Sequence, residues 1–185
     1  MIALACSCLL SVGFAARPVE PEPPPDPQFT QQSPNGTFEI TQYREERTGW
    51  HSKLHFFNQT RSDVHFEDWY DWPAEYNISP DGHWILQIQK SGSGANIPVL
   101  LHLESNGRIW RMEEFGERAW DFCSSHTDIN WDKAYHNGAE FKGWNLKRNE
   151  LRFALHAAYD NKQFYGFRRE FIYDLRRNTF RLASK

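Results

Sequence analysis

Short stretches in which apolar and polar residues alternate recur along most of the chain, and this pattern limits the folds that it can adopt. Three segments share an outline of strand, polar turn and strand: 54–66, 99–112 and 170–182. Two of them are preceded by a further hairpin, at 78–90 and 144–158. Alternation with a period of two, bounded by turn-forming residues, is typical of antiparallel hairpins. The pattern therefore predicts a mainly β fold.

The turns between these stretches support the same prediction. Asn106-Gly107 is the strongest short hairpin signal in the chain, and it is expected to join a strand at 99–103 to one at 108–112. Residues 79–82 suit a tight turn, and 145–149 occupy the matching place in a later hairpin. We expect the glycine-rich segment 91–96, which lies between two apolar strands, to form a flexible loop.

One of these turns carries a resemblance to a known family. Ile78-Ser-Pro-Asp-Gly-His-Trp-Ile-Leu86 resembles the SPDG-type turn of β-propeller repeats, in which a strand enters, turns at Pro-Asp-Gly and leaves as an aromatic-rich strand. The resemblance implies that the hairpins form blade-like sheets. A complete propeller needs at least four blades of four strands, whereas three can be outlined here. We therefore expect blade-like antiparallel sheets arranged as a sandwich or a partial propeller.

The segment 113–125 departs from the strand pattern. Within it, Phe115, Ala119, Phe122 and Cys123 fall at roughly helical spacing. This spacing predicts one short helix, with Cys123 on its apolar face as a small core residue.

The N-terminal part of the chain differs in composition from the rest. Residues 1–16 are apolar and uncharged and end in small residues, which is typical of a signal peptide. Leu4-Ala5-Cys6 looks equally like the end of a lipobox, in which Cys6 would carry the lipid. Residues 17–35 contain seven prolines and predict an extended linker. A single β-rich domain is then expected at 36–185.

This organisation predicts an exported protein that is periplasmic, secreted or anchored as a lipoprotein, with the N-terminus as the membrane tether. The formal net charge of -3 does not favour nucleic-acid binding. We expect no cofactor, and a partner that is a protein or a carbohydrate.

An aromatic and acidic segment is the first candidate site. Trp69, Tyr70, Asp71, Trp72 and Tyr76 lie close together in the sequence. Aromatic faces beside carboxylates bind sugar rings by stacking, or cationic peptides by cation–π contact. The alternative is that these rings cap the core, since aromatic side chains are usually buried.

Three other groups of residues are candidate sites. His51 and His55 lie on one face of a strand and could bind zinc together with His65 and Asp68, although isolated surface histidines are the commoner case. Cys123 could act as a nucleophile with His126 or His136, although a core role suits it better. The last group consists of basic pairs, which could form a positive patch but are more often solvated turns: Lys147-Arg148, Arg168-Arg169 and Arg176-Arg177.

These observations favour a binding or interaction domain of the bacterial envelope that is not an enzyme and that binds carbohydrate or peptide. One alternative is a hydrolase with a site made of histidine and carboxylate side chains. Another is an inhibitor-like or structural lipoprotein that contacts a single partner. No catalytic residue is assigned from the sequence.

Overall fold

Three four-stranded antiparallel sheets form the domain, as a computed structural model describes it for residues 29–57, 63–70, 72–129, 133–159 and 162–184. Sheet 1 contains β1 (Phe29–Gln32), β2 (Phe38–Glu45), β3 (Gly49–Phe56) and β4 (Val64–Tyr70). Sheet 2 contains β5 (Ala74–Ile78), β6 (Trp84–Gly92), β7 (Ala95–Leu103) and β8 (Ile109–Arg111). Sheet 3 contains β9 (Ala134–Asn145), β10 (Glu150–Tyr159), β11 (Lys162–Asp174) and β12 (Thr179–Leu182).

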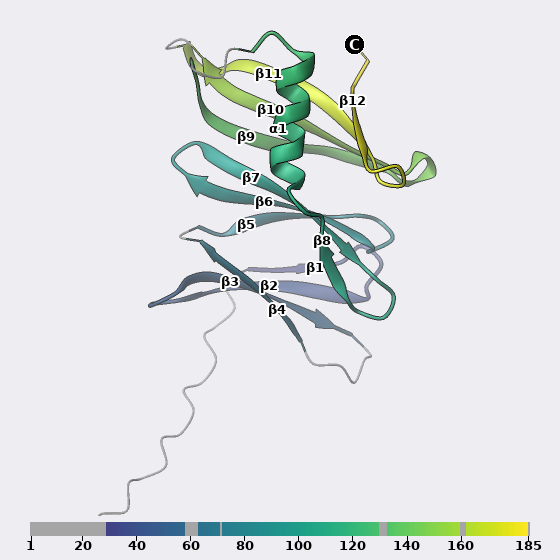
Figure 1. The fold of residues 1–185 in the computed structure, drawn as a ribbon. Coiled ribbons are helices and arrows are strands. Elements are labelled where there is room, and N and C mark those ends of the chain that lie inside the picture. Colours follow the sequence, from purple (N-terminus) through teal and green to yellow (C-terminus); the bar gives the residue numbers. More distant parts are fainter. Residues whose placement is uncertain (1–28, 58–62, 71, 130–132, 160–161, 185) are drawn as a thin grey trace, which may run out of the picture.

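Each sheet is a simple meander, because strands that follow one another in the chain are neighbours in the sheet. Figure 1 shows the sheets in succession, with sheet 2 between the other two. The α-helix of the described residues, α1 (Phe115–His126), connects sheet 2 to sheet 3 and lies across sheet 3. The predicted fold class is therefore confirmed: blade-like antiparallel hairpins with one short helix. Within the described ranges, no helix is both long enough and apolar enough to cross a membrane.

The first hairpin turn of sheet 1 and that of sheet 2 have the same sequence pattern, Ser-Pro-Asn-Gly at 33–36 and Ser-Pro-Asp-Gly at 79–82. In both, the glycine N–H donates to the serine carbonyl at 2.9 Å, and the glycine has a positive φ, 67° and 75°. Both serine side chains are buried and accept hydrogen bonds from the backbone that follows the turn. The turns also meet, because Asn35 Nδ2 donates to the carbonyl of Asp81 at 2.7 Å.

One hydrophobic cluster fills the space between sheets 1 and 2. Phe38 and Ile40 of β2 face Ile78 and Ile85 of sheet 2, and all four side chains are buried. A polar link reinforces this interface, since the side chain of Gln42 hydrogen bonds both the N–H and the carbonyl of the backbone at Ala74.

A second cluster fills the space between sheet 2, sheet 3 and α1. Leu86 and Leu100 of sheet 2 join Phe153 of β10 and Phe115 of α1 in it. Asn96 repeats the polar link at this interface, because it hydrogen bonds the backbone N–H and carbonyl of Ala139.

Sheet 2 is therefore buried on both faces. Along β6, Ile85 faces sheet 1 while Leu86 and Ile88 face sheet 3. The outer face of sheet 1 is polar and partly exposed by comparison, with Thr41, Lys53 and His55 at the alternate positions. A polar outer face explains why the stack of blade-like sheets has an end instead of continuing.

Two expectations about loops and linkers were wrong. Residues 91–96 are mostly strand, since β6 and β7 continue to a pair between Gly92 and Ala95 and leave only a tight turn at Ser93-Gly94. The positive φ of Gly94, 76°, allows this turn. The expected linker at 17–35 also contains β1, because the interval between Pro27 and Pro34 has no proline to prevent pairing with β2.

Candidate functional site

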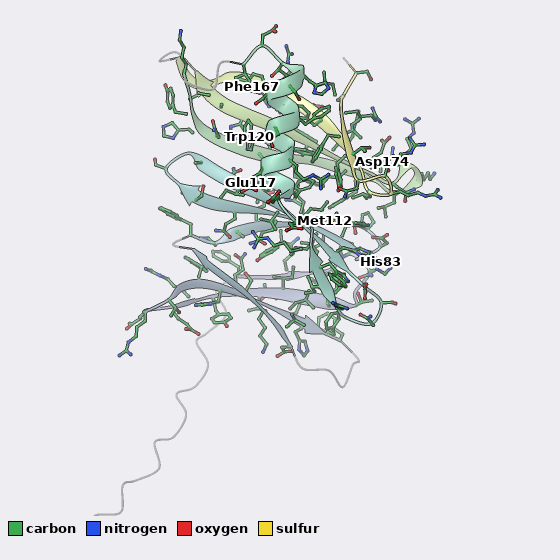
Figure 2. The ribbon with its side chains drawn as sticks, viewed as in Figure 1. His83, Met112, Glu117, Trp120, Phe167 and Asp174 are labelled. Carbon is green, nitrogen blue, oxygen red and sulfur yellow. The ribbon has the colours of Figure 1, made fainter. Side chains whose placement is uncertain are left out.

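A cleft of about 1110 Å³ opens between the C-terminal end of α1, the middle of β11 and the chain after β12. Residues of 125–129, 166–170 and 182–184 line it. Figure 2 labels Phe167 at this end of sheet 3, and Asp174 marks the opposite end of β11. Clefts of this size are the default place to look for a binding site.

The cleft exists because α1 covers only part of the inner face of sheet 3. Phe115 packs on Tyr173 with the ring centroids 5.1 Å apart, and Phe122 packs on Phe171 at 6.1 Å. Strand alternation places Phe167 on this same face, beyond the last turn of the helix. Leu182, which is opposite Phe171 in the ladder, also remains 41% exposed. The floor of the cleft is thus an uncovered part of a surface that is core elsewhere.

Arg169 is a charged residue on the inward-facing side of this floor. It lies between Phe167 and Phe171 on the inward-facing side of β11, opposite the buried Leu155. Its side chain is exposed in the cleft, and no carboxylate of the described residues forms an ion pair with it. The neighbouring Arg168 points to the outer face and pairs with Glu140 at 2.8 Å. A guanidinium without a counter-charge can form two parallel hydrogen bonds to a carboxylate of a ligand.

The walls of the cleft carry partial and full negative charge. Asp128 lines the cleft after the end of α1. The last carbonyl groups of a helix add partial negative charge at its C-terminus. Arg168 and Glu170 also line the cleft. The site therefore combines side chains of both signs of charge with apolar contacts from Phe167 and Leu182, which suits a ligand of mixed character.

Cys123 is a core residue, as its helical spacing predicts. Its side chain has no exposed surface, and burial raises the pKa of the thiol to about 11. Its sulfur lies 3.8 Å from the hydroxyl of Thr127. The ring of His126 stacks on Phe122, and its Nδ1 lies 2.9 Å from the Phe122 carbonyl and from Ser125 Oγ. Cys123 and His126 therefore do not form the thiol–base pair that nucleophilic catalysis requires.

Only part of the predicted aromatic site lies within the described residues. Trp69 and Tyr70 belong to the backbone of β4, their side chains are outside the described part, and Asp71 is outside it altogether. Trp72 is 37% exposed, and Lys90 Nζ lies 5.3 Å from the centroid of its ring.

Tyr76 corrects the prediction for this segment. The alternation of β5 directs its ring into the core between sheets 1 and 2, where it is 4% exposed and its hydroxyl donates to Ser52 Oγ at 2.6 Å. A ligand on the surface near Trp72 would not reach it.

The histidines of β3 lie on one face of the strand, as expected, but have separate partners. His51 Nε2 lies 2.6 Å from the hydroxyl of Thr48, and His55 Nδ1 lies 2.6 Å from Asp63 Oδ1. Asp63 also pairs with Lys53, and hydrogen bonds from Lys53 and His55 lower the pKa of its carboxyl. The described residues contain no group of three side chains arranged to hold a metal ion, while the side chains of His65 and Asp68 are outside them.

Arg169 and Leu182 were not singled out as a binding pair from the sequence. The signal was present, since Arg169 interrupts an alternating run of Phe167, Phe171 and Tyr173 at an inward-facing position. A charge at such a position requires either a buried partner or an opening to solvent.

No family model matches this chain, and a search of curated proteins found no similar sequence. The fold defines the class of the protein as a mainly β domain of three blade-like sheets.

Proposed function

We propose that this protein is an exported binding domain of the bacterial envelope that captures a peptide segment in the cleft between α1 and β11. The observation that carries the proposal is Arg169, an exposed guanidinium on the apolar floor of that cleft. In the bound state, a carboxylate of the peptide pairs with Arg169, and an apolar side chain beside it packs on Phe167 and Leu182.

The mixed charge of the cleft favours a peptide over a polyanion. Asp128 and the C-terminal end of α1 oppose a ligand that is negative throughout. A peptide that has a basic group next to its acidic and apolar side chains satisfies both signs of charge. The apolar, uncharged segment 1–16 and the proline-rich tract after it support the envelope location.

Selection of peptides from a random display library on the intact domain, followed by calorimetry, tests this function. Arg169→Gln should weaken the affinity for the best peptide by roughly 10- to 100-fold, because a hydrogen bond to a charged group contributes about 1.5–3 kcal/mol. Arg152→Gln is the matched control, since its exposed side chain lies on β10 outside the lining of the cleft, and we expect no more than a small change. If Arg169→Gln binds as tightly as the wild type, the cleft is not the site.

Two further measurements separate the alternatives. Carbohydrate binding through Trp72 remains a second candidate because its exposed ring lies beside Lys90; a glycan array that loses its signals with Trp72→Ala would favour it. Fractionation of cells, with the intact mass of the exported form, would show whether residues 1–16 are removed or Cys6 carries a lipid.

A further inference from the structure

Two turns of sheet 3 repeat one short sequence. The turn between β9 and β10 is Leu-Lys-Arg-Asn at 146–149, and the turn between β11 and β12 is Leu-Arg-Arg-Asn at 175–178. Each ends at an asparagine in the left-handed conformation, with φ of 54° at Asn149 and 57° at Asn178. The same basic tip is therefore built twice, about 30 residues apart in the chain.

The fold brings these two tips together. The N–H of Leu175 donates to the carbonyl of Asn149 at 2.7 Å. Leu175 packs against the core cluster of sheet 3, and Arg118 of α1 donates to the carbonyl of Asn178 at 3.1 Å. The core cluster and α1 thus hold the tips in place. The tips lie side by side at one end of the sheet, beside the labelled Asp174 (Figures 1 and 2).

The tips carry a surplus of positive charge. Lys147, Arg148, Arg176 and Arg177 all have exposed side chains, which we call the basic tips. The carboxylates near the tips offset little of this charge. Asp174 Oδ1 accepts the backbone N–H groups of Arg176 and Arg177, and its Oδ2 lies 4.0 Å from Nε of Arg177. Glu150 pairs with Arg181 at 2.7 Å. The chain as a whole has a net charge of -3, so this end differs in sign from the average of the molecule.

We infer that the basic tips form a docking surface for anionic lipid headgroups, independently of what the cleft binds. Four cations on two protruding turns present a convex surface, which suits a flat layer of phosphates more than a strand of polymer lying in a groove. The turns contain no aromatic residue that could stack on a base or a sugar ring. Lysine and arginine side chains near an anionic membrane each add to binding, and their contributions fall within a Debye length.

Co-sedimentation of the full chain with vesicles tests this inference. The probes are vesicles of phosphatidylcholine with and without phosphatidylglycerol, at low and at physiological salt. We expect binding to the anionic vesicles only, and weaker binding as salt is raised. Lys147→Gln with Arg148→Gln, or Arg176→Gln with Arg177→Gln, should each weaken binding roughly 30-fold, which is about 2 kcal/mol at 1.4 kcal/mol per tenfold.

A matched control comes from sheet 1, at the other end of the stack of sheets. Arg44→Gln with Arg47→Gln removes the same charge from exposed positions in sheet 1 and should leave vesicle binding unchanged. Segment 1–28 is identical in all variants, so differences between them report on the turns. Equal loss in the control and in the tip variants would overturn the inference, as would binding that ignores phosphatidylglycerol. Tip-dependent binding to heparin or DNA without binding to anionic vesicles would overturn it too.

Discussion

Replacing Gly82 with alanine tests whether the first turns of sheets 1 and 2 are held against each other. Gly36 and Gly82 occupy the same place in the two Ser-Pro-Asx-Gly turns, and both have a positive φ. Their surroundings differ. A Cβ at Gly36 would have no atom within 4 Å, whereas a Cβ at Gly82 would lie 2.3 Å from Asn35 Nδ2. Both substitutions therefore place an alanine at a positive φ, but only Gly82→Ala also brings its Cβ into a steric clash.

The shared cost is the left-handed backbone, about 1 kcal/mol for a residue with a Cβ. Gly36→Ala should lose only this amount. Gly82→Ala must also displace the side chain of Asn35 and break its hydrogen bond to the carbonyl of Asp81, which contributes about 1 kcal/mol more. We expect a total loss of about 2–3 kcal/mol for Gly82→Ala. In a domain of this size that corresponds to a fall in Tm of roughly 5–10 °C, against roughly 3 °C for Gly36→Ala.

Urea unfolding followed by tryptophan fluorescence measures both free energies, and equal m-values would show that the same surface is exposed in each variant. Asn35→Ala completes a double-mutant cycle with Gly82→Ala. With the asparagine side chain gone, the alanine at 82 should cost no more than the alanine at 36, so the two changes should be less than additive by about 1 kcal/mol. Full additivity, or equal losses for Gly36→Ala and Gly82→Ala, would refute the contact between the turns.

Three further predictions concern the core and its titrating groups. Iodoacetamide at mildly alkaline pH should label Cys123 only after denaturation, because burial raises its thiol pKa to about 11. Peptide mapping distinguishes Cys123 from the other cysteines. Rapid labelling of Cys123 in the native protein would contradict its buried position. Burial is the main cause that lowers the pKa of His102 and of His156 below 6.5, so protonation favours the unfolded chain. The free energy of unfolding should therefore fall as pH drops below about 6.5. Replacing both histidines with glutamine should flatten this pH dependence between pH 7 and 5. Phe115→Ala should lower the free energy of unfolding in urea by about 3–5 kcal/mol, since the ring is 2% exposed. Trp110→Ala should lower it by less than about 1 kcal/mol, because that ring is 42% exposed. Similar losses for the two variants would mean that α1 is not anchored through Phe115.

The hairpins could be predicted because their signals are local. Asn106-Gly107 and the turn at 79–82 each specify a reversal of the chain within a few residues, and the ladders have the expected partners. The helix was predictable for the same reason, since Phe115, Ala119 and Cys123 are all buried on one side of α1. Local chemistry thus decides where strands turn and where the pattern changes to a helix.

The errors arose where a longer-range contact decides the outcome. Four residues between two prolines become β1 because β2 offers an edge to pair with. The glycines of 91–96 indicate a loop by composition, yet the pairing of β6 with β7 extends through most of it. Tyr76 was assigned to a ligand surface because its neighbours are polar and aromatic, whereas β5 faces sheet 1 and draws the ring inward.

The cleft could not be located from the sequence for a related reason. Alternation shows that Phe167, Arg169 and Phe171 share a face of β11, but it does not show how far α1 extends over that face. The open floor depends on where the helix ends, and His126 is the last helical residue. A charged residue at an inward-facing strand position is a useful signal for such openings in other β domains.

The double burial of sheet 2 has a consequence for how the chain melts. Neither outer sheet can detach without exposing an apolar face of β6 and β7 to water, so opening at one interface removes support from the other. The domain should therefore unfold as one cooperative unit, although its architecture is repetitive. Backbone amides of β6 and β7 should exchange with deuterium last, and only through global opening. Truncation after sheet 2, at the start of α1, should give an insoluble fragment instead of a smaller stable stack.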